Sequence, residues 1–286
     1  MLRVSTGTPT QLLRSAAGAD GQLSGSADLA TLLSTDDLPL IPSDAALRSI
    51  GQPLIDASGR LIGRYHVWLR NDNADSMTST TDTNEVLTLL SIGQVGSTRK
   101  VIEVTIQKGR FPNPSSAVNL IETSTMSTEM DPRLKTINGL EGLAGSISRN
   151  ATDVFSPPAG TGQAIGDIGS PTSYRVATVN GDASVPSATG YGILLVRGEL
   201  TVTGNFTWTG LVLVIGKGIV HWNRTAPGAI YGGLFVARTR ADDGTLLSSP
   251  GNVTADFDAN NIYYDPAAIK ASNQTLPYSP IAIRER

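Results

Sequence analysis

The sequence of 286 residues contains no cysteine, which excludes disulfide bonds, thiolate metal sites and cysteine nucleophiles, and leaves the cellular compartment undecided. Only two histidines, His66 and His221, are present as candidates for base catalysis or zinc binding. No apolar run approaches the roughly 20 residues of a membrane helix, and the N-terminus lacks the apolar core of a signal peptide. The net charge of −3 argues against a nucleic-acid-attracting field over the whole surface, although a local basic patch is compatible with it.

The sequence contains short apolar segments with the two-residue period of β-strands. The segment 65–69 alternates between apolar and polar residues, an apolar run follows Glu85, and 101–106 alternates again. We predict a three-stranded antiparallel meander here. Composition divides the chain into four predicted parts: a partly helical or loose segment over 1–50, the meander over 51–112, a linker with a helix over 113–175, and a repetitive domain over 176–286.

The predicted helix of the linker begins at Asp131, which can cap it, and Pro132 suits its first position. Apolar residues then recur every three or four positions and form one stripe, made of Leu134, Ile137, Leu140, Leu143 and Ile147. Such a stripe predicts a helix that covers another apolar surface. Near the N-terminus, Ser43 or Asp44 is a second candidate helix start.

The repetitive domain returns to a glycine followed by four apolar residues. Gly192, Gly210 and Gly233 begin such segments, and Asn261 begins a looser one, at offsets of 18, 23 and 28 residues. In a parallel β-solenoid each turn adds one rung about 4.8 Å from the last, and insertions leave at the corners, so the offsets lengthen. We therefore predict a mainly β fold, with a short parallel solenoid preceded by the meander and the helix. Hairpins of an antiparallel sandwich are the alternative.

The solenoid hypothesis predicts specific neighbours. Leu195, Leu213 and Val236 should stack in register. A second strand should place residues 200–202 over 218–220, with Glu199 on Lys217. The runs after Gly192 and Gly210 are apolar at successive positions, which indicates that both faces of that sheet are covered, one by the interior and the other by the helix after Asp131 or by a partner.

Several stretches together resemble the PilX-type type IV pilus assembly proteins, the large minor pilins of Gram-negative and related bacteria. The C-terminal ones are "GYGILLVRGELTVTGNFTWTGLVLVIGKGIVHW", "GAIYGGLFVARTR", "NNIYYD" and "PYSPIAIRER". Upstream, "YHVWLRNDNAD" and "DTNEVLTLLSIGQVGSTRKVIEVTIQK" are similar to the pilin-like head of that family. The resemblance covers roughly residues 60–286.

The resemblance implies a non-enzymatic, extracellular component of a type IV pilus, acting in pilus initiation or in adhesion at the tip. Its partners would be other minor pilins and a tip adhesin. Proteins of that family start with a prepilin leader and an apolar helix carrying a glutamate, and this chain has neither. We expect one of three explanations. The chain is a truncated ectodomain, its true start lies upstream, or it uses the same modules for another purpose.

Two sites are candidates for small ligands. The polar loop after residue 71 brings together Asp72, Asp75 and Asp82, oxygen ligands of the kind that calcium prefers, although any solvated loop has this composition. No other cofactor is indicated, and His221 has no second histidine nearby. A ligand surface for sugars or bases could be formed by aromatic and basic residues of the solenoid, namely Trp208, Trp222, Arg224, Tyr231, Arg238 and Arg240. The same aromatic residues could instead fill its core.

We expect no enzymatic activity, because no carboxylate pair, Ser/His/Asp set or phosphate loop can be assembled. Two further functions stay open: a module that binds DNA or a glycan for uptake or attachment, and a self-assembling scaffold like the bactofilins. A basic stripe of Arg197, Arg224, Arg238 and Arg240 on one face would favour DNA binding. An uncovered apolar solenoid end would favour polymerisation, and a covered end the pilin.

Overall fold

The computed structural model describes residues 8–109, 111, 112, 114, 116–122, 131–158 and 160–286. The chain forms two compact units, one made of Met1–Gly109 with Pro277–Arg286 and the other of Arg110–Leu276. This division differs from the four predicted parts. The N-terminal 50 residues belong to the first unit, the predicted linker belongs to the solenoid unit, and the last ten residues leave it.

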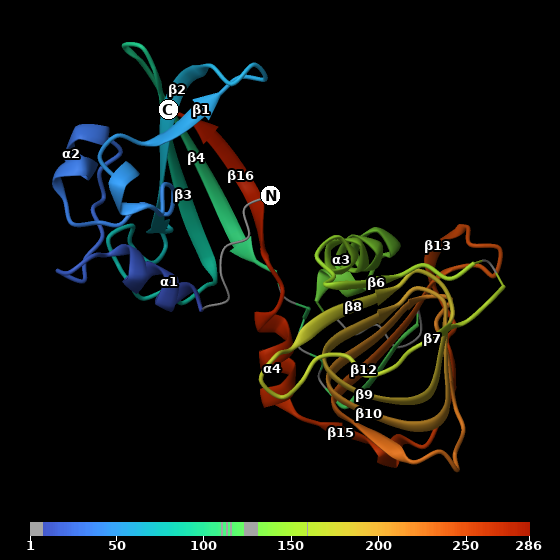
Figure 1. Cartoon of the computed structure of the whole chain (residues 1–286). Coiled ribbons are helices and arrows are strands. Elements are labelled where there is room, and N and C mark those ends of the chain that lie inside the picture. Colours follow the sequence, from blue (N-terminus) through green and yellow to red (C-terminus); the bar gives the residue numbers. More distant parts are fainter. Residues whose placement is uncertain (1–7, 110, 113, 115, 123–130, 159) are drawn as a thin grey trace. The chain divides into compact units, whose positions relative to one another are not determined.

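The first unit is built on a five-stranded antiparallel sheet with the order β1-β2-β3-β4-β16 (Figure 1). The strands are β1 (Gln52–Ile55), β2 (Leu61–Asn71), β3 (Val86–Val95), β4 (Thr98–Lys108) and β16 (Tyr278–Glu285). The predicted meander is the part formed by β2, β3 and β4. The prediction missed β16, which pairs with β4 from the far end of the chain. Glu103 of β4 fixes this pairing by binding both Arg284 at 2.6 Å and Arg286 at 2.7 Å.

The N-terminal segment is an ordered part of this unit. Its helices are α1 (Pro9–Ala16), α2 (Leu29–Ser34) and the 3₁₀ turn η1 (Ala45–Leu47), which Asp44 caps as predicted. Thr8 and Gln11 form a capping box at α1. Leu13 packs on the sheet residues Leu69, Leu87 and Ile106, and α2 packs on Trp68, Leu90 and Ile92 through Leu29 and Leu32. Through these contacts the N-terminal segment forms part of the hydrophobic core of the first unit.

The second unit is a parallel β-solenoid, and in the sequence it is inserted between β4 and β16. Its strands pair in parallel, with β13 as an antiparallel addition to β12 (Figure 1). They are β5 (Val118–Ile121), β6 (Asp153–Phe155), β7 (Gln163–Ala164), β8 (Arg175–Val179), β9 (Ala183–Val196), β10 (Glu199–Gly216), β11 (Ile219–Trp222), β12 (Gly228–Arg240), β13 (Leu246–Gly251), β14 (Thr254–Asp256) and β15 (Ile262–Tyr264).

The register confirms the predicted stacking for the first two rungs, because Gly192 pairs with Gly210 and Leu195 with Leu213. The pairing is parallel, so the antiparallel sandwich is wrong. The third rung differs from the prediction by one residue: Leu213 pairs with Phe235, and Val236 pairs with Val214. A slip of one residue moves a side chain to the opposite face of a strand.

Gly232, and not Gly233, is the equivalent of the earlier glycines. It has φ +145°, close to +120° at Gly192 and +132° at Gly210. A Cβ on Gly232 would lie 1.9 Å from the carbonyl oxygen of Gly210. The corner therefore requires a glycine on each of three rungs, and the sequence "YGG" offers two candidates of which backbone geometry selects the first.

The predicted second strand is also shifted. Glu199 pairs with Ile219 and Leu200 with Val220, not with Lys217 and Gly218. The corner at 216–218 accounts for this, since it adds residues between the rungs. Lys217 instead bonds Asp182 at 2.9 Å. The expected ladder between Glu199 and Lys217 does not exist.

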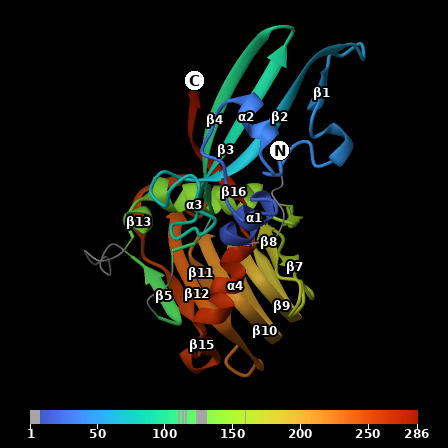
Figure 2. The same ribbon diagram turned by 90° about the vertical axis from the view of Figure 1, so that its left-hand side faces the viewer.

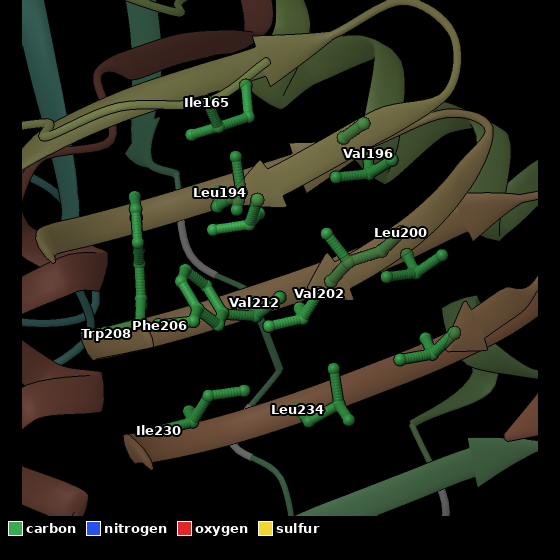
Figure 3. Packing of buried hydrophobic residues seen from close by; sticks show 14 of the residues in the cluster. Ile165, Leu194, Val196, Leu200, Val202, Phe206, Trp208, Val212, Ile230 and Leu234 are labelled. Carbon is green, nitrogen blue, oxygen red and sulfur yellow. The ribbon is translucent and has the colours of Figure 1, made fainter. Parts of the chain in front are cut away.

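Alternate residues of the long strands face opposite ways, as the apolar runs predicted. Leu194, Val212 and Leu234 lie in register and point into the interior with Phe206 and Trp208 (Figure 3). The intervening residues, such as Leu195 and Leu213, belong to a second cluster outside the solenoid. Both faces of this sheet are therefore buried.

Two helices cover the outer face of that sheet. The predicted one, α3 (Ile137–Arg149), contributes Leu140, Ala144 and Ile147. Thr136 caps it, while Asp131 caps a separate 3₁₀ turn, η3 (Pro132–Leu134). The sequence analysis missed α4 (Pro266–Gln274), which lies across β9, β10 and β12 (Figure 2) and adds Ile269. Near it lies a further 3₁₀ turn, η4 (Ala259–Asn261).

Candidate interaction surfaces

The first unit has a groove lined by both polar and aliphatic side chains, which we call the apolar groove after its exposed aliphatic residues. It has a volume of about 580 Å³ and is lined by residues of α2, of the segment before β1, of β2 and of β3. Four large aliphatic side chains on it are unusually exposed: Leu33 (41%), Ile50 (50%), Leu61 (51%) and Ile62 (39%). Contiguous exposed aliphatic surface of this kind marks interaction sites in soluble proteins. Further exposed apolar residues of the same unit are Leu54, Ile55 and Val95.

The charges in the groove are of one sign. Arg64 and Arg99 are the only charged residues that line it within the described part of the chain. Arg64 donates to the carbonyl oxygen of Gly51 at 3.1 Å, and Arg99 lies 3.9 Å from Asp28 with both side chains about half-exposed. Such a distant, exposed ion pair contributes little. The groove therefore suits an apolar partner segment that carries a carboxylate.

His66 lies at the floor of this groove. Its ring stacks on Trp68, with centroids 5.0 Å apart, and Nε2 is 2.9 Å from the carbonyl oxygen of Arg48. Burial lowers the pKa of His66, and the hydrogen bond to the Arg48 carbonyl partly offsets this. Burial therefore disfavours the charged form of the ring, which is 4% exposed.

A cluster around Glu141 of α3 ties the helix to the solenoid. Its carboxylate accepts hydrogen bonds from Arg197 at 2.5 Å, from Arg240 at 2.8 Å and from Thr239 at 2.6 Å. Burial alone would raise the pKa of Glu141, but the hydrogen bonds from Thr239 and Arg240 and the charge of Arg197 hold the pKa below its ordinary value. We call these four residues the Glu141 cluster.

The predicted basic stripe is absent from the described residues. Arg197 and Arg240 share Glu141, Arg238 bonds Asp242 at 3.1 Å, and Arg224 bonds Asp256 at 3.1 Å. Each arginine of the set therefore has a carboxylate partner, and the local field is mixed. A cleft of about 520 Å³ at the same corner also contains the pair of Lys217 with Asp182.

The predicted ligand surface divides between the interior and the outside. Trp208 and Trp222 are buried in the solenoid core, where Phe206 contacts both rings at centroid distances of 6.0 and 5.5 Å. The indole of Trp208 donates to the carbonyl oxygen of Gly192 at 3.0 Å. Their predicted role in ligand binding is therefore wrong, because neither ring reaches solvent. Both tryptophans occupy strand positions that alternate toward the interior, and this alternation in the sequence could have indicated their burial.

Tyr231, by contrast, is exposed. It is 43% accessible, and its ring stacks on that of Tyr263, which is 51% accessible, at a centroid distance of 5.3 Å and an interplanar angle of 14°. The two residues are partners in the β12–β15 register. The six predicted ligand residues thus do not form one site.

The three aspartates of the predicted calcium loop are engaged in hydrogen bonds within it. Asp72 accepts from the backbone of Asp75 at 3.2 Å and from the amide of Asn84 at 3.1 Å. Asp75 accepts from the hydroxyl of Thr83 at 2.5 Å and from its backbone at 2.7 Å, which lowers the pKa of Asp75. These bonds occupy oxygen atoms of both carboxylates and order the loop.

Asp82 differs from the other two. Burial raises its pKa, and one oxygen accepts from the backbone of Glu85 at 3.0 Å while the other has no hydrogen-bond partner among the described residues. In the described part of the chain, no three His, Cys, Asp or Glu residues are grouped so as to hold a metal ion. Calcium binding here stays a prediction.

A membrane-crossing helix is not found among the residues that the structure describes, since none is both long and apolar enough. No protein-family model and no curated protein matches the sequence. Among solved structures, the chain is similar to the competence-associated pilin ComZ from Thermus thermophilus, at 10% identity and a TM-score of 0.24. The similarity covers 98% of this chain and 93% of that one. It is a distant likeness.

Proposed function

We propose that the chain is a non-enzymatic, extracellular subunit of a type IV pilus, of the minor-pilin kind, and that it acts in pilus initiation or at the tip. The observation that carries this proposal is the nested architecture. The chain leaves an antiparallel sheet after β4, builds the solenoid, and returns as β16 to complete the same sheet. The sequence stretches that resemble minor pilins fall on both parts of this arrangement.

The apolar groove supports a role in subunit assembly. A pilus subunit must bury apolar surface against its neighbours, and Leu33, Ile50, Leu61 and Ile62 offer such surface. With Arg64 and Arg99 beside them, the favoured occupant is an apolar segment of another pilus subunit bearing a carboxylate.

The solenoid end at β5 favours a pilin over a bactofilin-like polymer. β5 pairs in parallel with β12, and Val118 and Leu120 pack against the interior cluster there. The segment comes from upstream of the solenoid and covers the last rung of this sheet, which blocks end-to-end addition at that edge.

Filament preparations from the source bacterium test the proposal. We expect the chain in the fraction sheared from cells, and fewer pili by electron microscopy when its gene is deleted. Complementation with Ile62→Glu should restore neither, whereas Leu246→Glu should restore both, because Leu246 is 54% exposed on β13 and lies in the other unit. Unchanged piliation on deletion, with the chain absent from the sheared fraction, would contradict a pilus role.

A further inference from the structure

One side of the solenoid carries a column of tyrosines that neither the core nor the proposed assembly surface uses. The register places Tyr191, Thr209, Tyr231 and Tyr263 at the same position on four successive rungs, on strands β9, β10, β12 and β15. Rungs are about 4.8 Å apart, so the column runs along the solenoid axis. We call it the tyrosine column.

The column points away from the core. The residues that precede its members are buried, and three of them, Trp208, Ile230 and Ile262, belong to the interior cluster. Because side chains alternate along a strand, the column itself faces outward. Tyr231 and Tyr263 are about half-exposed, and their hydroxyl groups make no hydrogen bond within the described part of the chain.

The strand positions around the column carry no cation, and the charged groups near it are carboxylates. Asp167 accepts from the backbone N–H of Thr189 at 2.7 Å, and Asp265 interacts with Tyr174, whose ring lies 6.0 Å from that of Tyr191. Two residues earlier on each rung, the outward positions hold Thr189, Thr207 and Ala229. At the outward positions of this side, the described strands β9, β10, β12 and β15 present no lysine, arginine, aspartate or glutamate between 187 and 191, 205 and 209, or 229 and 231. The arginines of the solenoid are held by carboxylates, as described above.

This chemistry selects among ligands. A nucleic acid requires cations for its phosphates, and the column has none. An acidic polysaccharide would require them too. A neutral saccharide presents apolar C–H faces that pack on aromatic rings, and hydroxyl groups that bond to tyrosine and threonine hydroxyls, so it matches both halves of the surface.

We infer that the tyrosine column binds a neutral polysaccharide strand lying along the solenoid axis. This inference does not depend on the proposed pilus role, since the residues belong to a different surface in the other unit. It supplies a second function, attachment to a glycan-coated surface.

Binding of the full chain to an array of neutral and acidic oligosaccharides, and to cellulose and chitin particles, tests the inference. We expect retention on at least one neutral glycan that persists when the salt concentration is raised. The double variant Tyr231→Ala/Tyr263→Ala should bind about tenfold more weakly, and Tyr231→Phe/Tyr263→Phe should lie between it and the wild type, because the rings remain. Leu246→Ala, which removes an equally exposed apolar side chain elsewhere in the unit, should bind as the wild type does.

Because both positions are exposed, we expect these variants to fold as the wild type does, and equal melting temperatures would verify this. Absence of binding to every neutral glycan would overturn the inference, as would equal binding by the double alanine variant. Self-association that the double variant abolishes would make the column a contact between copies, and salt-sensitive DNA binding lost in the same variant would make it a nucleic-acid site. Either result would also overturn it.

Discussion

Replacement of Gly210 by alanine tests the solenoid register at its most constrained point. Gly210 has φ +132°, and a Cβ placed there would lie 2.1 Å from the carbonyl oxygen of Gly192 and 2.3 Å from the hydroxyl oxygen of Ser272. The backbone conformation alone costs an alanine about 1–2 kcal/mol. Relief of the overlap requires the neighbouring rung or α4 to move, and overpacking of this kind costs about 1–3 kcal/mol.

The sum is about 2–5 kcal/mol, which corresponds to a melting temperature lower by roughly 4–20 °C for a domain of this size. Gly142→Ala is the matched control, because Gly142 is an exposed residue of α3 and its Cβ would meet nothing within 4 Å. Alanine in a helix interior should raise stability by about 1 kcal/mol. Calorimetry of the full chain measures both variants. A Gly210→Ala protein that melts within about 2 °C of the wild type would refute the register.

Three further predictions concern charge and metal. Glu141→Gln should lower stability by about 2–3 kcal/mol at pH 7, since it leaves two arginines without their carboxylate. Because the pKa of Glu141 is lowered on folding, its contribution is present at neutral pH and is lost as the pH falls through the folded-state pKa, so the melting curves of variant and wild type should converge in acid; a constant gap would contradict this. If the loop binds calcium, EDTA should lower the melting temperature and Asp72→Ala should abolish that effect, whereas identical curves with chelator and with saturating calcium would exclude it. Duplex DNA should bind no tighter than about micromolar at physiological salt, and nanomolar, salt-sensitive binding lost in Arg238→Glu would show that the paired arginines had been misread.

The local sequence pattern was sufficient to predict a parallel solenoid, but it did not predict the register of every rung. The run after Gly192 repeats after Gly210 because both rungs have the same length, and this confirmed the parallel stacking of Leu195 on Leu213. The third rung was predicted one residue out of register, since "YGG" contains two glycines and only backbone geometry distinguishes them. A comparison of segments at one fixed offset cannot detect residues that are inserted at the corners between rungs.

The pairing of strands that are distant in the sequence could not be predicted either. β16 lies about 170 residues after β4, and no local signal in its sequence indicates which sheet it joins. The apolar groove was missed for the same reason, because Leu33, Ile50 and Leu61 come together only when α2 and the segment before β1 are folded against β2. Tyr231 was singled out from its type, but its stacking on Tyr263 follows from the lengthened fourth rung.

Site-specific cross-linking in assembled filaments tests most directly whether the groove joins this chain to a pilus. The absence of cysteine allows a single one to be introduced at Ile62 in the groove or at Leu246 on the solenoid, and each can carry a photoreactive label. The account predicts that the label at residue 62 links the chain to another pilus subunit in the sheared fraction, and that the label at residue 246 does not. Filaments that contain the chain but give no cross-link from residue 62 would contradict the groove as the assembly surface.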